Sequence, residues 1–168
     1  MPLRAIKAND LETILKWRNS DAVRLNMFSQ ATITFEQHRA WFSRMQKDTS
    51  SVWWLYECGT GKASGVVYFT DIDIESGTSF WGFYAAPDSK KGIGSEMGRE
   101  ALNRAFAELG IRKVYGDVLE FNERSQRFHE KLGFEREGCM REHHKLDNAY
   151  YDVIRYGMLK SEWNVNGS

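Results

Sequence analysis

Apolar and polar positions along the first half of the chain predict four strands and three helical pieces. Apolar or alternating runs indicate strands over residues 3–7, 52–58, 63–72 and 79–86, and the last three should form an antiparallel meander. Helical spacing predicts a helix that runs from an N-cap at Asp10 to Asn19, and a second piece over 20–28. A third helix should open on the capping box of Thr34 and Gln37 and run to Lys47.

After Pro87 the pattern changes to alternating helices and strands. Apolar spacing predicts a helix over 93–109 that ends at Gly110, a strand over 113–119, a helix over 122–132, and strands over 134–140 and 151–159. This order predicts an α/β (α+β) fold with a central mixed, mostly antiparallel sheet flanked by helices. No linker, repeat or low-complexity run interrupts residues 1–168, so we expect a single domain.

Charge and composition narrow the functional classes. The 23 Lys and Arg residues balance 23 Asp and Glu residues, which argues against nucleic acid as a partner. No apolar run approaches the ~18 residues of a membrane-spanning helix, and the N-terminus lacks a signal-peptide core, so we expect a cytoplasmic protein without membrane contact. Cys58 and Cys139 lack metal-binding spacing. We interpret both as reduced, buried apolar residues and expect no metal site.

The loop that precedes the long helix has the composition of a phosphate-binding site. Gly92 and Gly94 allow a ligand to approach the backbone closely, and the unpaired amides and dipole of a helix start favour an anion. Lys90 and Lys91 add positive charge there. The two glycines alone are equally compatible with an ordinary turn. The loop is no Walker motif, and Met97 stands where a dinucleotide-binding fingerprint needs its third glycine.

Two segments resemble motifs of the GNAT acetyltransferases. The loop with Gly92 and Gly94 is similar to motif A, Q/R-x-x-G-x-G/A before a helix, although Ser89 replaces Gln or Arg and the loop is one residue shorter. The segment NERSQRFHEKLGF, over 122–134, is similar to the family's N-x-x-S/A-x-x-[LF]-[YH]-x-K-x-G-F and follows at the family's spacing. As an ordinary helix, the same segment is capped by Asn122 and closed by glycine.

The resemblance implies the twisted mixed sheet of the GNAT fold and acetyl-CoA (coenzyme A) as the acyl donor. Backbone amides late in the strand over 79–86 would serve the thioester, and the loop amides would hold the pyrophosphate. The residues that the resemblance places at acetyl-CoA are Phe83, Tyr84, Ala85, Lys90, Lys91, Gly92, Ile93, Gly94, Ser95, Asn122, Ser125, Phe128 and His129.

Acetyl transfer to an amine needs a deprotonated nitrogen, donors for the tetrahedral oxyanion and a proton for the leaving thiolate. In the GNAT family a tyrosine of the second motif is the usual acid, and His129 occupies its position. We expect His129 and Tyr84 as catalytic residues, with Tyr68, Tyr150 and Tyr151 as other proton donors. The alternative is that His129 only packs in its helix or bonds coenzyme A.

Energetics favour an acceptor amine of low pKa. Freeing an amine of pKa about 10.4 at pH 7 costs roughly 4.6 kcal/mol, against about 1.4 kcal/mol for an amine of pKa about 8. No pair of carboxylates stands out as a strong base. A sugar amine flanked by electron-withdrawing oxygens therefore fits better than a lysine-like amine.

The N-terminal half resembles one subgroup of the family. Its W-R-N sequence, T-x-E-x-H-x-x-W pattern and W-G-F-Y sequence are similar to the bacterial N-acetyltransferases of pseudaminic acid biosynthesis. That resemblance implies direct acetylation of the 4-amine of UDP-4-amino-4,6-dideoxy-N-acetyl-β-L-altrosamine, a nucleotide-linked amino sugar for flagellin or surface glycans. The acceptor residues would be Trp17, Arg18, Asn19, His38, Trp41 and Trp81, with Arg18 and His38 at the nucleotide and Trp81 in the sugar pocket.

Other interpretations stay open at the level of sequence. Trp17 and Trp41 are equally well explained as core residues. The C-terminal segment also resembles ribosomal-protein alanine N-acetyltransferases and polyamine acetyltransferases, so a protein N-terminus or a polyamine is the alternative acceptor. A third interpretation is a protein that binds acetyl-CoA without turnover. The abundant aromatic residues are compatible with a homodimer.

Overall fold

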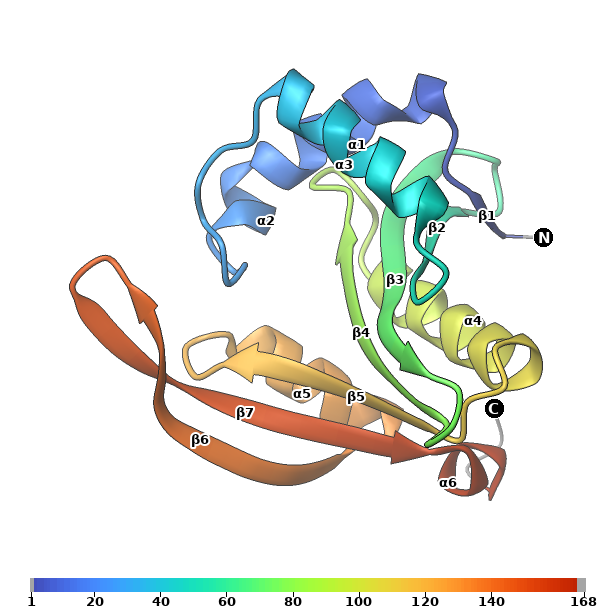
Figure 1. Cartoon of the computed structure of the whole chain (residues 1–168), viewed down its shortest axis with the longest axis vertical. Helices are drawn as coiled ribbons and strands as arrows, with labels where there is room; N and C mark the ends of the chain where they lie inside the picture. Colours follow the sequence, from blue (N-terminus) through green and yellow to red (C-terminus); the bar gives the residue numbers. More distant parts are fainter. Residues whose placement is uncertain (1, 166–168) are drawn as a thin grey trace.

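The computed structural model describes residues 2–165, which fold around one seven-stranded sheet of order β1-β2-β3-β4-β5-β7-β6 (Figure 1). The strands are β1 (Leu3–Ala5), β2 (Val52–Glu57), β3 (Ala63–Asp73), β4 (Thr78–Ala85), β5 (Lys113–Leu119), β6 (Glu135–Leu146) and β7 (Ala149–Leu159). The helices are η1 (Ala8–Asp10), α1 (Leu11–Asn19), α2 (Asp21–Arg24), α3 (Phe35–Lys47), α4 (Ile93–Glu108), α5 (Glu123–Leu132) and α6 (Lys160–Val165). The expected α/β fold with a mostly antiparallel sheet is confirmed.

A split in the sheet is the feature that positions the site. Among the described residues every neighbouring pair of strands is antiparallel except β4 and β5. Those two strands are parallel, pair only over 78–80 with 113–115, and then diverge (Figure 1). From Trp81 onward the edge of β4 that faces β5 makes no ladder pairs within residues 2–165. We call the resulting opening the β4–β5 split.

Two buried clusters lie on opposite faces of the sheet, because side chains alternate along each strand. Val67, Phe69 and Trp81 belong to the cluster that α4 completes, whereas Val66 and Leu55 pack with residues of α1 and α3. In Figure 1 α4 passes behind β3, and α1 and α3 lie at the top of the view. At the split, α4 therefore lies on one face of the sheet, and α1 and α3 lie on the other.

Helix ends form where the sequence predicts them. Thr34 accepts a hydrogen bond from the Gln37 amide at 3.1 Å, and the Gln37 side chain accepts one from the Thr34 amide at 2.9 Å. The Asn122 side chain caps α5 by accepting from Ser125 N at 3.2 Å. Gly110, with φ 66°, follows α4 in the left-handed conformation that glycine adopts without strain.

The expected helix over 20–28 is shorter than predicted, because side-chain hydrogen bonds hold the chain after Arg24 in a loop. It forms only over Asp21–Arg24. Arg24 donates to the Gln30 carbonyl at 2.9 Å, and the Gln30 side chain donates to the Leu25 carbonyl at 2.7 Å. These two bonds hold the following loop in a non-helical path.

The start of the chain also differs from expectation. The first strand ends at Ala5 rather than at residue 7. Asp10 makes no side-chain cap to α1. Its carboxylate instead binds Arg4 at 2.8 and 2.9 Å and the Lys7 amide at 2.7 Å, because the charged partner on the neighbouring strand is the stronger donor.

The C-terminal hairpin is longer than the pattern predicts. β6 continues beyond residue 140 to Leu146, and β7 begins at Ala149. As an edge strand, β6 is mostly exposed and lacks the apolar alternation that marks a half-buried strand. The sequence also gives no sign of the final helix, α6, which buries Trp163.

Neither cysteine is the buried apolar residue that we expect. Cys139 is exposed and Cys58 is half-buried. Hydrogen bonds from Thr60 and Ser64 lower the pKa of the Cys58 thiol to about 6, with its sulfur 3.1 Å from Thr60 Oγ1. Within residues 2–165, no helix is long and apolar enough to cross a membrane.

Candidate functional site

The start of α4 presents backbone amides to the outside. The first helical bond runs from Glu96 N to the Gly92 carbonyl at 3.1 Å, and the amides of Gly94 and Ser95 have no carbonyl partner within the described chain. Gly92 has φ 97°, and a Cβ there would meet no atom within 4 Å. A Cβ on Gly94 would first meet Phe128 at 3.8 Å. This open, donor-rich helix start has the geometry of an anion site.

Charges around the loop support the same chemistry. Lys90 and Lys91 are exposed beside the helix start. The neighbouring acid, Asp88, is bound by Lys62 Nζ at 3.0 Å, and this ion pair lowers the pKa of Asp88. The loop is further tied to β3 by a hydrogen bond from the Ala86 amide to the Ser64 carbonyl at 2.8 Å. Lys90 and Lys91 therefore face solvent from an anchored backbone.

Aromatic side chains fill the space between the split and α5. The rings of Phe83 and Phe128 lie 4.5 Å apart between their centroids. A Cβ on Gly98 would lie 2.9 Å from the Phe128 ring, so this glycine lets α4 and α5 approach. The structure thus brings the helix start, the second half of β4 and α5 together, as the resemblance implies. Asn122 and Ser125 serve here as the cap of α5.

The narrow end of the split is closed by Trp81. Its ring is 1% exposed and packs over Gly116 of β5, where an added Cβ would lie 2.9 Å from the indole. The indole Nε1 donates to Nε2 of His129 at 3.1 Å. The expectation that Trp81 lines a sugar pocket is contradicted by this burial.

The environment of His129 holds it neutral. The side chain is 3% exposed, and burial lowers its pKa to about 4. Because an indole N–H can only donate, His129 Nε2 is the acceptor and Nδ1 carries the proton, which it donates to the Ser125 carbonyl at 2.8 Å. Both ring nitrogens are occupied and there is no extra proton at neutral pH. The expected role of His129 as general acid does not fit this geometry.

Tyr68 of β3 and Tyr84 of β4 lie on the face of the sheet that α1 and α3 cover. Tyr68 pairs in register with Gly82, and its ring covers the position where a Gly82 side chain would stand. Trp53 of β2 stacks on the other side of the Tyr68 ring at 4.1 Å. Neighbouring strands are only about 4.8 Å apart, so a tyrosine side chain is long enough to lie across its partner strand. The Tyr68 hydroxyl lies over Gly82, in the part of β4 that no longer pairs with β5.

Arg18 of α1 completes this group. Its positive charge opposes the rise in pKa that burial causes in both Tyr68 and Tyr84, so the charge of Arg18 acts on both phenols. Arg18 Nη2 donates to the Ser29 carbonyl at 2.7 Å, whereas Nη1 is buried without a partner in the described residues. A buried guanidinium nitrogen with an unused donor favours a ligand oxygen.

The other expected acceptor residues have structural roles. Trp17 and His38 are 7% and 4% exposed and lie in the interior, and His38 stacks on Trp41 at 5.1 Å. Burial lowers the pKa of His38. Asn19 uses both ends of its amide on the backbone of Ile33, at 2.8 Å each. Among the expected acceptor residues, Arg18 and His38 each have a buried nitrogen without a partner in the described residues, and Arg18 is the more exposed of the two.

Sequence reasoning named Tyr68 only as one proton donor among several and did not identify Gly82. A glycine inside a strand is the available signal, because it marks the close approach of another group. The sequence does not reveal that this group is the Tyr68 ring, since their pairing depends on the register of β3 and β4.

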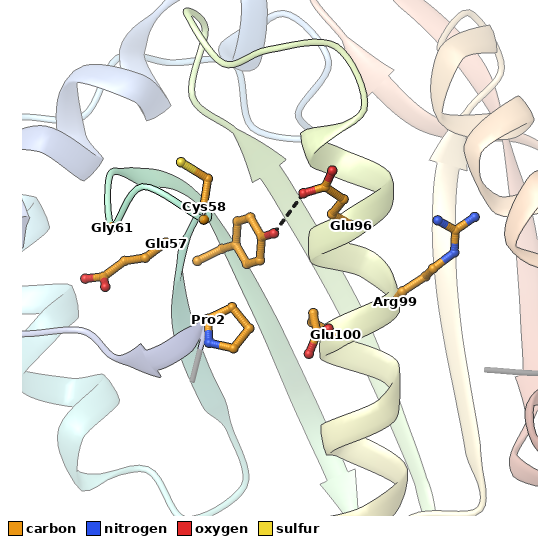
Figure 2. A pocket seen from close by; sticks show the side chains of 9 residues that line it. Pro2, Glu57, Cys58, Gly61, Glu96, Arg99 and Glu100 are labelled. Carbon is orange, nitrogen blue, oxygen red and sulfur yellow. Dashed lines mark hydrogen bonds between the residues drawn. The ribbon is translucent and has the colours of Figure 1, made fainter.

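A separate cavity of about 690 Å³ lies between the β2 end and α4 (Figure 2). The Tyr56 hydroxyl donates to the carboxylate of Glu96 at 3.2 Å. Burial and this carboxylate raise the pKa of Tyr56 to about 12. Cys58, Arg99 and Glu100 also line this cavity, which contains none of the residues expected to bind substrate.

Comparison with known proteins decides the family. The model of the acetyltransferase (GNAT) domain matches residues 1–135. The chain belongs to the GNAT acetyltransferase family. Members of this family are acyltransferases that use acetyl-CoA, and the open amides of α4, the neighbouring lysines and the split fit a phosphate-bearing ligand with an extended arm.

Individual relatives differ in the activities that their names give. An uncharacterized prophage-derived N-acetyltransferase of Bacillus subtilis, YokL, is 40% identical over 105 residues, 61% of this chain and 58% of its own length. Acetyltransferase PseH of Campylobacter jejuni is 26% identical over 130 residues, 77% of this chain and 79% of PseH. Spermidine N-acetyltransferase of Vibrio cholerae, solved with CoA and spermine, superposes with a TM-score of 0.90 at 23% identity and covers 96% of each chain. The last likeness concerns the fold.

Proposed function

We propose that this protein transfers the acetyl group of acetyl-CoA to the 4-amine of a UDP-4-amino-4,6-dideoxy sugar, of the kind used in pseudaminic acid biosynthesis. The observation that carries this acceptor is Arg18, which has one buried guanidinium nitrogen without a partner among the described residues and whose charge acts on Tyr68 and Tyr84. A cation in this position attracts an acceptor that carries phosphate or many oxygens. The same charge disfavours a polycation.

Residues around the split would hold acetyl-CoA, donate hydrogen bonds to the oxyanion and exclude water. When bound, acetyl-CoA supplies the acetyl group as a thioester. The amides of Gly92, Gly94 and Ser95 and the exposed Lys90 and Lys91 would hold its phosphates. Consecutive amides of a strand point to opposite edges, so only alternate members of the Phe83, Tyr84 and Ala85 amides face the unpaired edge of β4, where they would be donors for the developing oxyanion. Water is excluded at the narrow end by Trp81 and Gly116.

A polyamine is the second candidate acceptor. It is favoured by the likeness in fold to the V. cholerae spermidine N-acetyltransferase, which extends over 96% of this chain. A ribosomal-protein N-terminus is the remaining alternative. Both acceptors carry amines that must lose a proton before attack. Arg18 would oppose the approach of a polyamine in its charged form.

The test is release of coenzyme A thiol with acetyl-CoA and three acceptors in parallel. These are UDP-4-amino-4,6-dideoxy-N-acetyl-β-L-altrosamine, spermidine, and a peptide with an N-terminal alanine. We expect turnover with the nucleotide sugar and little with the other two. Turnover confined to spermidine or to the peptide would overturn the proposed acceptor but leave the acyl transfer intact.

Arg18→Gln tests the observation on which the proposal rests. Loss of one charge-assisted hydrogen bond should raise the KM for the nucleotide sugar by roughly 10- to 100-fold, with the KM for acetyl-CoA unchanged. Arg39→Gln is the matched control, because Arg39 is exposed on α3. Equal KM values for the nucleotide sugar in the two variants would show that Arg18 does not meet the acceptor.

A further inference from the structure

A phenol of β3 lies next to the narrow end of the split. Tyr68 covers Gly82, which lies two residues beyond Phe80, where β4 last pairs with β5. Tyr84 lies two residues farther along β4, roughly 7 Å at the rise of a strand. Of these two tyrosines, Tyr68 is therefore the one closer to the point at which an arm inserted along β4 from the α4 loop would end.

His129 and Tyr156, which lie at this end of the split, already have hydrogen-bond partners. Both nitrogens of His129 are used, by Trp81 and by the Ser125 carbonyl. The Tyr156 hydroxyl donates to Glu130 at 3.0 Å. Within the described part of the chain the Tyr68 hydroxyl has no such partner, and its ring is fixed between Trp53 and Gly82. The Tyr68 ring is thus held in place, and its hydroxyl is available to donate a hydrogen bond to a ligand.

We propose that the Tyr68 hydroxyl donates a hydrogen bond to the sulfur of coenzyme A. The buried His129 cannot donate this bond, because both of its ring nitrogens already have partners. The inference rests on the proposed use of acetyl-CoA in the split but not on the identity of the acceptor.

The chemistry is balanced without ionising Tyr68. As the amine nitrogen forms its bond to the carbonyl carbon and the C–S bond breaks, the electron pair of that bond goes to sulfur. Tyr68 stabilises this charge by its hydrogen bond and keeps its own proton. The nitrogen releases one proton to solvent, and the sulfur takes one up. Burial favours the neutral phenol, and the charged and titratable groups facing it are Arg18 of α1 and Tyr84 of β4.

The experiment measures the titration of the coenzyme A thiol while it is bound, without acceptor. The thiolate is followed by its ultraviolet absorbance between pH 6 and pH 10 in the wild type, Tyr68→Phe and Tyr150→Phe. A donor to sulfur favours the thiolate, so Tyr68→Phe should raise the midpoint by about 1 pH unit. The control is Tyr150→Phe. Tyr150 is among the expected proton donors, but it is 58% exposed and pairs with Lys145 in the β6–β7 hairpin instead of lying on β4, so this variant should not change the midpoint.

A second variant reaches the same hydroxyl by another route. Gly82→Ala places a methyl group in the volume of the Tyr68 ring and should displace it, which raises the thiol midpoint in the same direction. With a competent acceptor, Tyr68→Phe should also lower kcat about 100-fold, the scale for one donor to a developing charge. The kcat loss should leave the KM for acetyl-CoA unchanged.

Three outcomes would overturn the inference. The first is an unchanged midpoint in a folded Tyr68→Phe that binds coenzyme A. The second is a raised midpoint in Tyr84→Phe but not in Tyr68→Phe. The third is loss of coenzyme A binding in Tyr68→Phe, because a donor to sulfur alone adds little to binding of the whole molecule. None of these outcomes depends on which amine the enzyme acetylates, so failure here is separate from failure of the proposed acceptor.

Discussion

At the scale of the residue, burial decides what a histidine in an enzyme can do. His129 stands at the position of the general acid of the family. Its ring stacks on Tyr156 at 5.2 Å and accepts a hydrogen bond from the indole N–H of Trp81. Because burial keeps the His129 ring neutral, the ring stabilises the folded protein and does not transfer protons. Its low pKa therefore has a consequence for stability.

Folding stability should fall in acid because of His129. The unfolded side chain takes up a proton below about pH 6.5, whereas the folded one does so only near its pKa of about 4. Between those values the unfolded state binds the extra proton, so the free energy of unfolding falls as the pH is lowered, by about 3 kcal/mol in all. Urea unfolding at pH 7.5 and pH 4.5 measures the change.

A comparison of variants separates the effect of His129 on stability from that of the carboxylates, which titrate in the same pH range. His129→Gln should be less sensitive to acid than the wild type by about 2–3 kcal/mol, because glutamine does not titrate. His143→Gln, at an exposed position of β6, should behave as the wild type. An equal loss of stability in His129→Gln and the wild type would show that the folded histidine is not held neutral.

At the scale of the element, the C-terminal hairpin is tied to the N-terminal loop between α2 and α3. The Nε2–H of His144 on β6 donates to the Phe28 carbonyl at 2.7 Å, and the two rings meet edge to face at 4.9 Å. This contact joins residues on either side of the β4–β5 split, from elements that are far apart in sequence.

His144→Ala should loosen that loop. A net hydrogen bond is worth about 1 kcal/mol, so amide hydrogen exchange over residues 25–34 should become about fivefold faster. Exchange in α4 should not change. His143→Ala on the same strand serves as the control, and equal loop protection in both variants would mean that the loop is held by other contacts.

At the scale of the whole molecule, exposed aromatic side chains near the far end of β5 and the start of β7 favour self-association. Phe121 and Tyr150 are 41% and 58% exposed, and Phe121 packs edge to face on Tyr151 at 5.3 Å. Such apolar rings on a surface of zero net formal charge are typical of an interface. The homodimer therefore stays a prediction, and it is open to a direct measurement.

Light scattering in solution measures the assembly. We expect a mass of twice 19.5 kDa, with Tyr150→Ser shifting the protein toward the single chain. Ile74→Ser, at a position that is 69% exposed in the β3–β4 turn, is the control and should not change the mass. A mass of 19.5 kDa at every concentration would contradict the dimer.

Much of the fold follows from local rules that the sequence carries. The caps at Thr34 and Asn122 and the glycine at 110 act within one helical turn, so their positions are readable without tertiary contacts. The meander of β2, β3 and β4 follows from alternation and short turns. Exceptions such as β6 arise where the strand lies at the edge and both faces meet solvent.

The order of elements, the family motifs and the phosphate loop before α4 are all readable from the sequence, because each depends on residues that are neighbours along the chain. Tertiary packing sets the state of His129, whose partner Trp81 is 48 residues away, and the place of Tyr68 across Gly82. It also determines which aromatic residues are core, and it leaves a buried nitrogen of Arg18 without a partner among the described residues. Burial and hydrogen-bond partners of this kind arise only when strands find their register, and they set the chemistry that a side chain can perform.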